Sequence, residues 1–186
     1  MVRIITGTAK NSQLIVPSTA KPISDRAKST IFSVIGSDIE GQRILDLYAG
    51  SGSLGIEALS RGATHCTFVD NAKIAIDDLA KNLTKTKMTE KSTLVKQTAF
   101  RFLSDQHADT YDIVFADPPY ETYRESGRQL EGLVENIIPV IPLGGAIIIK
   151  HPRMLPLPKI ETLTLADTRK FGRNAVTLWV KTTAEE

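Results

Sequence analysis

Apolar and polar residues in the middle of the chain follow two alternating periods. Short β-rich runs, nearly all apolar, occur at residues 43–47 (RILDL), 65–70 (HCTFVD), 92–97 (STLVKQ), 111–117 (YDIVFAD) and 145–151 (GAIIIKH). Between them, apolar residues share helical faces: Leu54, Ala58 and Leu59; Ile76, Leu79, Ala80 and Leu83; and Leu130, Val134, Ile137 and Ile138. This alternation predicts an α/β fold with a mostly parallel sheet, and the apolar strands predict that helices cover both of its faces.

Both flanks depart from this pattern. At the N-terminus two short apolar runs, VRIIT and QLIVP, are joined by a polar turn that contains glycine, which predicts a β-hairpin. A helix follows from Ser24 or Asp25, with Ser24 favoured as the N-cap, and its apolar face carries Ala27, Ile31, Phe32 and Ile35. Near the C-terminus, KIETLTL and NAVTLWV alternate by twos on either side of ADTRKFGR. They predict an antiparallel pair appended to the parallel sheet.

Length and composition limit the class of protein. The chain has 186 residues, of which 41% are hydrophobic and 24% are charged, and this suits one globular domain. No apolar run approaches the roughly 20 residues of a membrane-spanning helix, so we expect no membrane association. The N-terminus lacks the long apolar stretch of a secretory signal, which predicts a cytoplasmic protein. One cysteine, Cys66, and three histidines far apart in sequence offer neither a disulfide scaffold nor a zinc-binding cluster.

The net charge is only +2, but it is unevenly spread. Residues 1–30 carry five basic groups against one acid, and residues 150–181 carry seven against two. Residues 44–117 carry eight basic groups against ten acids. Basic ends around a near-neutral middle are consistent with a polyanion that contacts the ends, although ordinary solvated charge explains so small an imbalance about as well.

Residues 45–59 (LDLYAGSGSLGIEAL) predict a strand, a glycine-containing turn and a helix. Gly50 and Gly52 let the backbone pass close beneath a ligand, toward which the helix N-terminus points free N–H groups. Gly55 completes the G-x-G-x-x-G spacing of dinucleotide sites. A carboxylate on the strand, Asp46, would however repel a pyrophosphate. Asp46 instead suits a cationic ligand, such as the amino-acid end of S-adenosylmethionine.

The next strand ends in Asp70, 18 residues beyond Gly52. A carboxylate there can accept hydrogen bonds from both hydroxyls of a ribose, as adenosine-containing cofactors require. The alternative is structural: the glycines make a tight turn, and Asp70 caps the helix that follows.

The segment Asp117-Pro118-Pro119-Tyr120 ends the fourth predicted strand. Each proline fixes φ and lacks an N–H, so the turn is stiff. The Asp117 carboxylate and the Pro118 carbonyl can both accept hydrogen bonds from one planar amino group, which aims the nitrogen lone pair at a methyl donor. Tyr120 offers a face on which a base can stack. Ligands of open α/β sheets bind beyond the carboxyl ends of strands, where this turn and the glycine loop both lie. The alternative is a strand-ending turn with a core tyrosine.

The order DLYAGSGSLGIEALSRGA, FVD and FADPPY resembles the class I, Rossmann-like S-adenosylmethionine-dependent methyltransferases that methylate amino groups. The flanking segments RIITG (3–7), PISDR (22–26) and Phe171-Gly172 narrow the resemblance to the RsmD-type 16S rRNA guanine-N2 methyltransferases. It implies a Rossmann-like sheet of seven strands with an antiparallel C-terminal hairpin. It also implies a single domain over residues 1–186, in which residues 1–40 are an RNA-contacting hairpin and helix extension and residues 41–186 are the catalytic core.

The resemblance implies an enzyme that uses S-adenosyl-L-methionine to methylate N2 of a specific guanine in 16S rRNA or the small ribosomal subunit. We expect no metal, because nothing in the transfer calls for a Lewis acid, and a monomer is the default expectation. It places these residues at the cofactor: Asp46, Tyr48, Ala49, Gly50, Ser51, Gly52, Asp70, Asn71, Thr98 and Ala99. The catalytic residues that it implies are Asp117, Pro118, Pro119 and Tyr120. Those that it places near RNA, or as braces of the active-site wall, are Arg3, Lys10, Ser24, Asp25 and Arg26.

The chain departs from the family pattern at three places. Thr98 stands where the family commonly has an acid that contacts the adenine amino group, residues 10–13 are less basic than is common, and Pro22-Ile23 replaces a more usual R-P-T. Two other functions stay open: another nucleic-acid amino-methyltransferase, acting on adenine N6 in DNA or RNA, and a non-catalytic RNA- or cofactor-binding homologue. The short chain leaves little room for a DNA target-recognition domain, and the intact residues 117–120 argue against lost activity.

Overall fold

A computed structural model describes residues 2–21, 23–36, 38–123 and 128–183. Its main sheet has the strand order β5-β4-β3-β6-β7-β9-β8. These strands are β3 (Arg43–Leu47), β4 (His65–Asp70), β5 (Ser92–Lys96), β6 (Ile113–Ala116), β7 (Ala146–Pro152), β8 (Leu163–Phe171) and β9 (Asn174–Lys181). The first five in spatial order are parallel, and β9 is antiparallel to both β7 and β8. The predicted seven-stranded sheet with an antiparallel C-terminal hairpin is confirmed.

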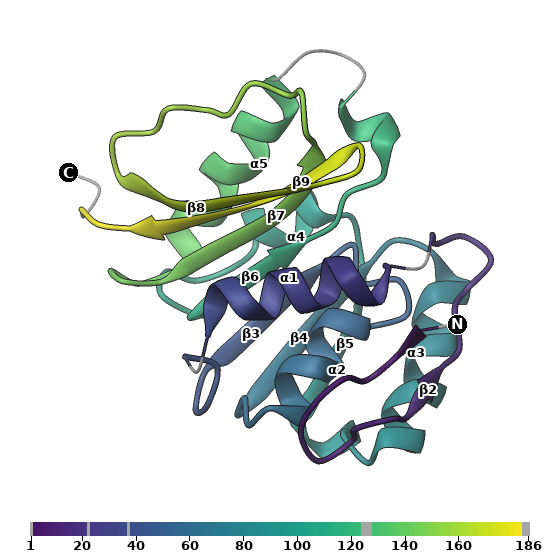
Figure 1. The fold of residues 1–186 in the computed structure, drawn as a ribbon. Coiled ribbons are helices and arrows are strands. Elements are labelled where there is room, and N and C mark those ends of the chain that lie inside the picture. Colours follow the sequence, from purple (N-terminus) through teal and green to yellow (C-terminus); the bar gives the residue numbers. More distant parts are fainter. Residues whose placement is uncertain (1, 22, 37, 124–127, 184–186) are drawn as a thin grey trace.

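Helices cover both faces of this sheet (Figure 1). One face packs against α1 (Asp25–Ile35), α2 (Ser53–Ser60) and α3 (Lys73–Thr86), and the other packs against α4 (Ala99–Ser104) and α5 (Arg128–Ile137). Short 3-10 turns occur at η1 (Thr89–Lys91), η2 (Tyr120–Tyr123) and η3 (Ile138–Val140). Side chains alternate across the strands, so Ile44 faces α1 and α2 while Leu45 faces α4 and α5. In the described part of the chain, no helix is long and apolar enough to cross a membrane.

The predicted N-terminal hairpin is present but short, because β1 (Val2–Arg3) and β2 (Gln13–Leu14) have only two residues each. Buried polar groups attach the segment between them to the core. Glu57 of α2 accepts hydrogen bonds from two consecutive backbone N–H groups of this segment, at 2.7 and 2.9 Å. The same carboxylate pairs with Lys28 of α1 at 3.4 Å, and both side chains are fully buried. Hydrophobic periodicity did not reveal this pair, because it counts both residues as surface.

The start of α1 agrees with the prediction, whereas other parts of the structure differ from it. The Ser24 N-cap of α1 is confirmed, since its Oγ accepts from the Ala27 N–H at 3.1 Å. The segment ADTRKFGR is not a separator, because β8 runs through it to Phe171 as an exposed edge strand, which tolerates polar residues. On α3, Ile76 and Ala80 are only half-buried. Helix α4 has six residues and was not predicted, because so short a segment gives too few turns for a periodic signal.

Candidate active site

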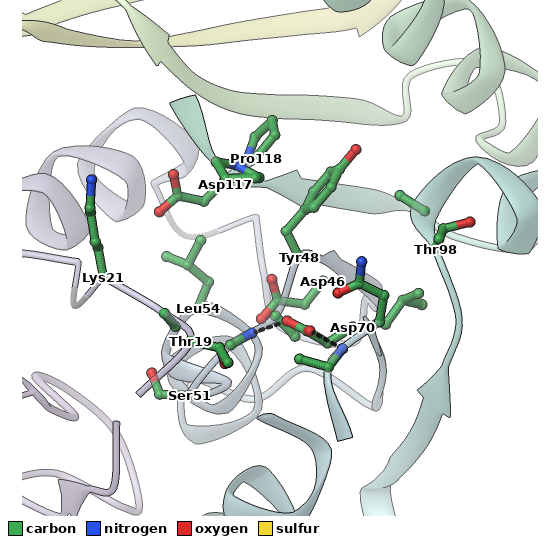
Figure 2. Close-up of a pocket in the computed structure, with 18 of the residues that line it drawn as sticks. Thr19, Lys21, Asp46, Tyr48, Ser51, Leu54, Asp70, Thr98, Asp117 and Pro118 are labelled. Atoms are coloured by element: carbon green, nitrogen blue, oxygen red, sulfur yellow. Dashed lines mark hydrogen bonds between the residues drawn. The ribbon is translucent and has the colours of Figure 1, made fainter. Parts of the chain in front are cut away.

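A pocket of about 840 Å³ opens beyond the carboxyl ends of β3, β4 and β6 (Figure 2). It brings together the glycine loop after β3, the Asp-Pro-Pro turn after β6 and residues 19–23 before α1. Its lining includes most of the sequence-predicted site: Asp46, Tyr48, Ala49, Gly50, Ser51, Asp70, Asn71, Thr98, Ala99, Asp117, Pro118 and Pro119. Parallel strands that end at one edge of the sheet place these segments around one pocket, as the strand order predicts.

Other predicted residues do not line the pocket in the described structure. Gly52, the N-cap of α2, is not among the residues that line the pocket, and the side chain of Tyr120 lies outside the described part of the structure. The residues predicted to contact RNA also stand outside the lining: Arg3, Lys10, Ser24, Asp25 and Arg26.

The glycine loop is shaped by packing and by hydrogen bonds within the protein. Gly50 and Gly52 have φ of 53° and 74°, in the left-handed region that favours glycine. A side chain on Gly52 would collide with Leu79 of α3. The N–H groups of Gly50, Gly52 and Gly55 donate to the Asp70 carboxylate, the Ala49 carbonyl and the Asp46 carboxylate, at 2.7 to 2.9 Å. The expectation that the N-terminus of the helix points free N–H groups at a ligand therefore fails for Gly55, in the first turn of α2, and stays a prediction for the rest of that turn.

Asp46 is buried at the floor of the pocket. The pKa of its carboxyl group is raised to about 8, chiefly by burial and in part by the charges of Asp117 and Asp70, while the hydrogen bond from Gly55 N opposes the rise. At neutral pH this pKa leaves the carboxyl group mostly protonated. A cationic group beside it would favour the carboxylate, so this side chain is suited to a ligand that carries positive charge.

Asp70 secures the loop from the end of β4. Its two carboxylate oxygens accept from the N–H groups of Gly50 and Ala72, each at 2.9 Å (Figure 2). The bond to Ala72 reaches the residue before the first turn of α3, so Asp70 orders the approach to that helix. Each carboxylate oxygen has a second acceptor site, so ribose binding by Asp70 is compatible with these bonds and stays a prediction.

Two further pocket residues, Thr98 and Tyr48, also contribute to the local structure. Thr98 is the N-cap of α4, and its hydroxyl oxygen accepts from the Arg101 N–H at 3.4 Å. Its role at adenine stays a prediction. Tyr48 has φ of 59°, which is unusual for a residue other than glycine, and its ring points into the pocket between Pro118 and Thr98 (Figure 2). Burial raises the pKa of the Tyr48 phenol to about 12, so it stays a neutral hydrogen-bonding group.

Sequence reasoning missed the partner of Asp117. Lys150 on β7 donates from Nζ to both carboxylate oxygens of Asp117, at 2.6 and 2.8 Å, and each side chain is only about 20% exposed. Burial raises the pKa of Asp117, and the Lys150 ammonium opposes that rise. The available signal was a lysine that follows three isoleucines in a strand predicted to be buried.

The basic residues at the two ends of the chain form two separate sets. We call Arg3, Lys10 and Arg26 the N-terminal basic set. Lys10 lies in a turn whose backbone bonds to Ser60, the last residue of α2, and so sits at the end of that helix remote from the pocket. Arg3 pairs with Asp25 at 3.3 Å, on the surface.

We call Arg153, Lys170 and Arg173 the C-terminal basic set, and all three are exposed. The backbone N–H of Arg153 donates to the carbonyl of Arg173, which fixes the β8–β9 turn beside the end of β7. Because β7 is parallel to β6, this turn lies at the same edge of the sheet as Asp117. The C-terminal basic set therefore borders the pocket edge.

The described residues contain no group of three or more His, Cys, Asp or Glu side chains that could hold a metal ion. The acids that line the pocket outnumber the two lining lysines, since Asp46, Asp70, Asp117 and Glu121 stand against Lys21 and Lys150.

Comparison with known proteins places the chain in a family. Residues 2–180 match the family model described as conserved hypothetical protein 95. The chain is 33% identical over 159 residues to Ribosomal RNA small subunit methyltransferase D of Escherichia coli (strain K12), a match that covers 76% of this chain and 79% of that protein. YlbH of Bacillus subtilis is 32% identical over 185 residues, covering 97% and 99%. The solved structure of Escherichia coli YhhF superposes with a TM-score of 0.83 at 29% identity, over 98% of this chain and 99% of that one. The chain therefore belongs to this family, and the resemblance drawn from its motifs is confirmed.

Proposed function

We propose that this protein transfers a methyl group from S-adenosylmethionine to N2 of a guanine in small-subunit ribosomal RNA. The observation that carries this proposal is the single pocket that joins the glycine loop to the Asp117-Pro118-Pro119 turn. Its volume of about 840 Å³ lies in the range of pockets that enclose drug-sized ligands. The name of the Escherichia coli relative, Ribosomal RNA small subunit methyltransferase D, supports the choice of substrate class.

The pocket chemistry fits this cofactor. When bound, S-adenosylmethionine supplies an electrophilic methyl group on a positively charged sulfur. The buried Asp46 favours a positive ligand charge, and the half-buried Asp70 retains acceptor sites for ribose hydroxyls. Thr98 and Ala99 would lie at the adenine, and the shape of the loop is fixed before the cofactor arrives. These residues bind and orient, and none of them has to take part in bond making.

The Asp117 turn acts on the target base. The Asp117 carboxylate and the Pro118 carbonyl accept hydrogen bonds from the amino group, which directs the nitrogen lone pair toward the cofactor side of the pocket. With the cofactor bound, this nitrogen would form a bond to the methyl carbon that the cofactor supplies, and the electrons of the broken carbon–sulfur bond would stay on sulfur. The surplus proton on nitrogen leaves after transfer. Catalysis is therefore mainly positioning, with charge stabilisation by Asp117. A base in folded RNA must first be unstacked.

The test is methyl transfer from tritiated S-adenosylmethionine to small ribosomal subunits that lack the modification, followed by digestion and chromatography of the labelled nucleosides. We expect the label in N2-methylguanosine. Label in N6-methyladenosine would identify an adenine methyltransferase instead. Cofactor binding without any transfer, either to particles or to free rRNA, would support the non-catalytic alternative and refute the proposal.

A further inference from the structure

Lys150 faces the predicted catalytic carboxylate from the neighbouring strand. Ala116 of β6 pairs with Ile149 of β7, so the next residues along each strand, Asp117 and Lys150, lie side by side. The backbone of Lys150 is itself fixed: it pairs with Val176 of β9, and its carbonyl accepts from the Tyr123 hydroxyl at 2.9 Å. The ammonium group is therefore presented to Asp117 by a rigid part of the sheet.

The two bonds from Lys150 use part of the acceptor capacity of Asp117. A carboxylate has about four acceptor sites, and Nζ takes one on each oxygen. The remaining sites can accept from a substrate amino group. Lys150 thus fixes the rotation of the carboxylate and leaves room for a second donor.

Building on the proposed function, we infer that Lys150 is a positioning residue that keeps Asp117 ionised and oriented as an acceptor for the target amino group. A protonated carboxyl group would present a donor where the amino group needs an acceptor. Burial favours that protonated form, and the adjacent ammonium opposes it. The charge of Asp117 also interacts with Asp46 on β3, so the pocket gathers acids that disfavour ionisation of one another.

The ionisable side chains that share this pocket come from several of the segments around it. They are Lys21 before α1, Asp46 on β3, Tyr48 after β3, Asp70 at the end of β4, Glu121 on η2 and Lys150 on β7. Of these, Lys150 is the one that the structure shows bonded to the carboxylate of Asp117. Removing its charge therefore leaves Asp117 in a buried site beside other acids.

The experiment compares the wild-type protein with Lys150→Met, Lys150→Arg and the surface control Lys91→Met. The first readout is the titration of the Asp117 carboxyl carbon by ¹³C NMR without cofactor or RNA, with its signal assigned by Asp117→Asn. We expect the midpoint to rise by about 1 to 3 pH units in Lys150→Met. It should stay near the wild-type value in Lys150→Arg and in Lys91→Met. This readout does not depend on the proposed function.

The second readout is the rate of methyl transfer to ribosomal particles at pH 5.5 and pH 8. We expect the rate at pH 5.5, divided by the rate at pH 8, to fall in Lys150→Met by up to about tenfold for each unit by which the Asp117 midpoint rises, because the ionised fraction falls tenfold per unit once the midpoint lies above the pH of the assay. Lys150→Arg should restore the ratio. An unchanged Asp117 midpoint, or faster transfer in Lys150→Met, would overturn the inference, the latter by showing that Lys150 competes with the substrate. Absence of transfer by the wild type would refute the proposed function but leave the NMR test decisive.

Discussion

The two sides of the pocket are held in place by different means. On the cofactor side, the glycine loop is fastened by backbone hydrogen bonds to Asp46 and Asp70 and by close packing of its glycines. On the target side, Asp117 is held by a proline turn and by one lysine. A change on the first side should therefore alter folding stability and cofactor affinity together. A change on the second side should alter turnover while leaving stability and cofactor affinity nearly unchanged.

The largest effect should come from Asp117→Ala, on the target side. Loss of one positioned acceptor should lower turnover by about 10²–10³-fold, by analogy with the deletion of an oxyanion-hole donor. Cofactor affinity, measured by calorimetric titration, should change far less. Turnover within about twofold of the wild type would show that Asp117 does not accept hydrogen bonds from the amino group. It would also contradict the view that changes on the target side act mainly on turnover.

Asp46→Asn tests the cofactor side through the pH dependence of folding stability. The native pKa of about 8 lies above the ordinary value near 4, so the folded protein binds a proton that the unfolded chain releases between these values. Stability of the ligand-free wild type therefore falls as pH rises from about 4 to 8. Asparagine removes this penalty and can still accept from Gly55 N–H. We expect Asp46→Asn to raise the free energy of unfolding by about 1–4 kcal/mol at pH 8 and to leave it unchanged at pH 4.

Urea denaturation at the two pH values measures this difference, and cofactor affinity should fall in the same variant because a cation loses its counter-charge. A destabilised variant at pH 8, or a difference that does not depend on pH, would contradict the assignment of Asp46 as a buried, protonated acid.

The sequence predicts features that leave a local pattern of residues, and it does not predict contacts between residues that are distant in the chain. The five core strands and both loops were predictable, because apolar strands and glycine or proline turns have strong local signatures. The roles of Gly52 and Lys150 were not, since they depend on Leu79 and Asp117, which are distant in sequence. The buried pair of Lys28 and Glu57 escaped for the same reason: charge in a sequence indicates surface until a partner is known.

Gly55→Ala tests the packing of the cofactor side with a smaller change. The new methyl carbon would lie 2.5 Å from Cys66 Sγ and closer still to the Phe68 ring, so the helix has to shift. Overpacking of this kind costs about 1–3 kcal/mol of stability. The matched control is Gly132→Ala on α5, where the added carbon meets nothing within 4 Å and should stabilise the helix by up to about 1 kcal/mol. Equal stability of both variants in denaturant would show that the loop is not held by packing.

The smallest expected effects are on RNA binding. They test whether the target side of the pocket also carries the contacts to RNA phosphates. The C-terminal basic set borders the pocket edge beside Asp117, whereas Lys10 of the N-terminal basic set lies beyond the far end of α2. A plot of the logarithm of RNA affinity against the logarithm of salt concentration has a negative slope. Each lost phosphate contact should make that slope shallower by about 0.7–0.9. Replacing the C-terminal basic set with alanine should therefore flatten this salt dependence, whereas Lys10→Ala should leave it unchanged. Binding of a ribosomal RNA fragment over a salt series, beside a cofactor titration that should not move, measures both. A larger loss of RNA affinity from Lys10→Ala than from the C-terminal basic set would mean that RNA crosses the hairpin and that the phosphate contacts lie away from the target side.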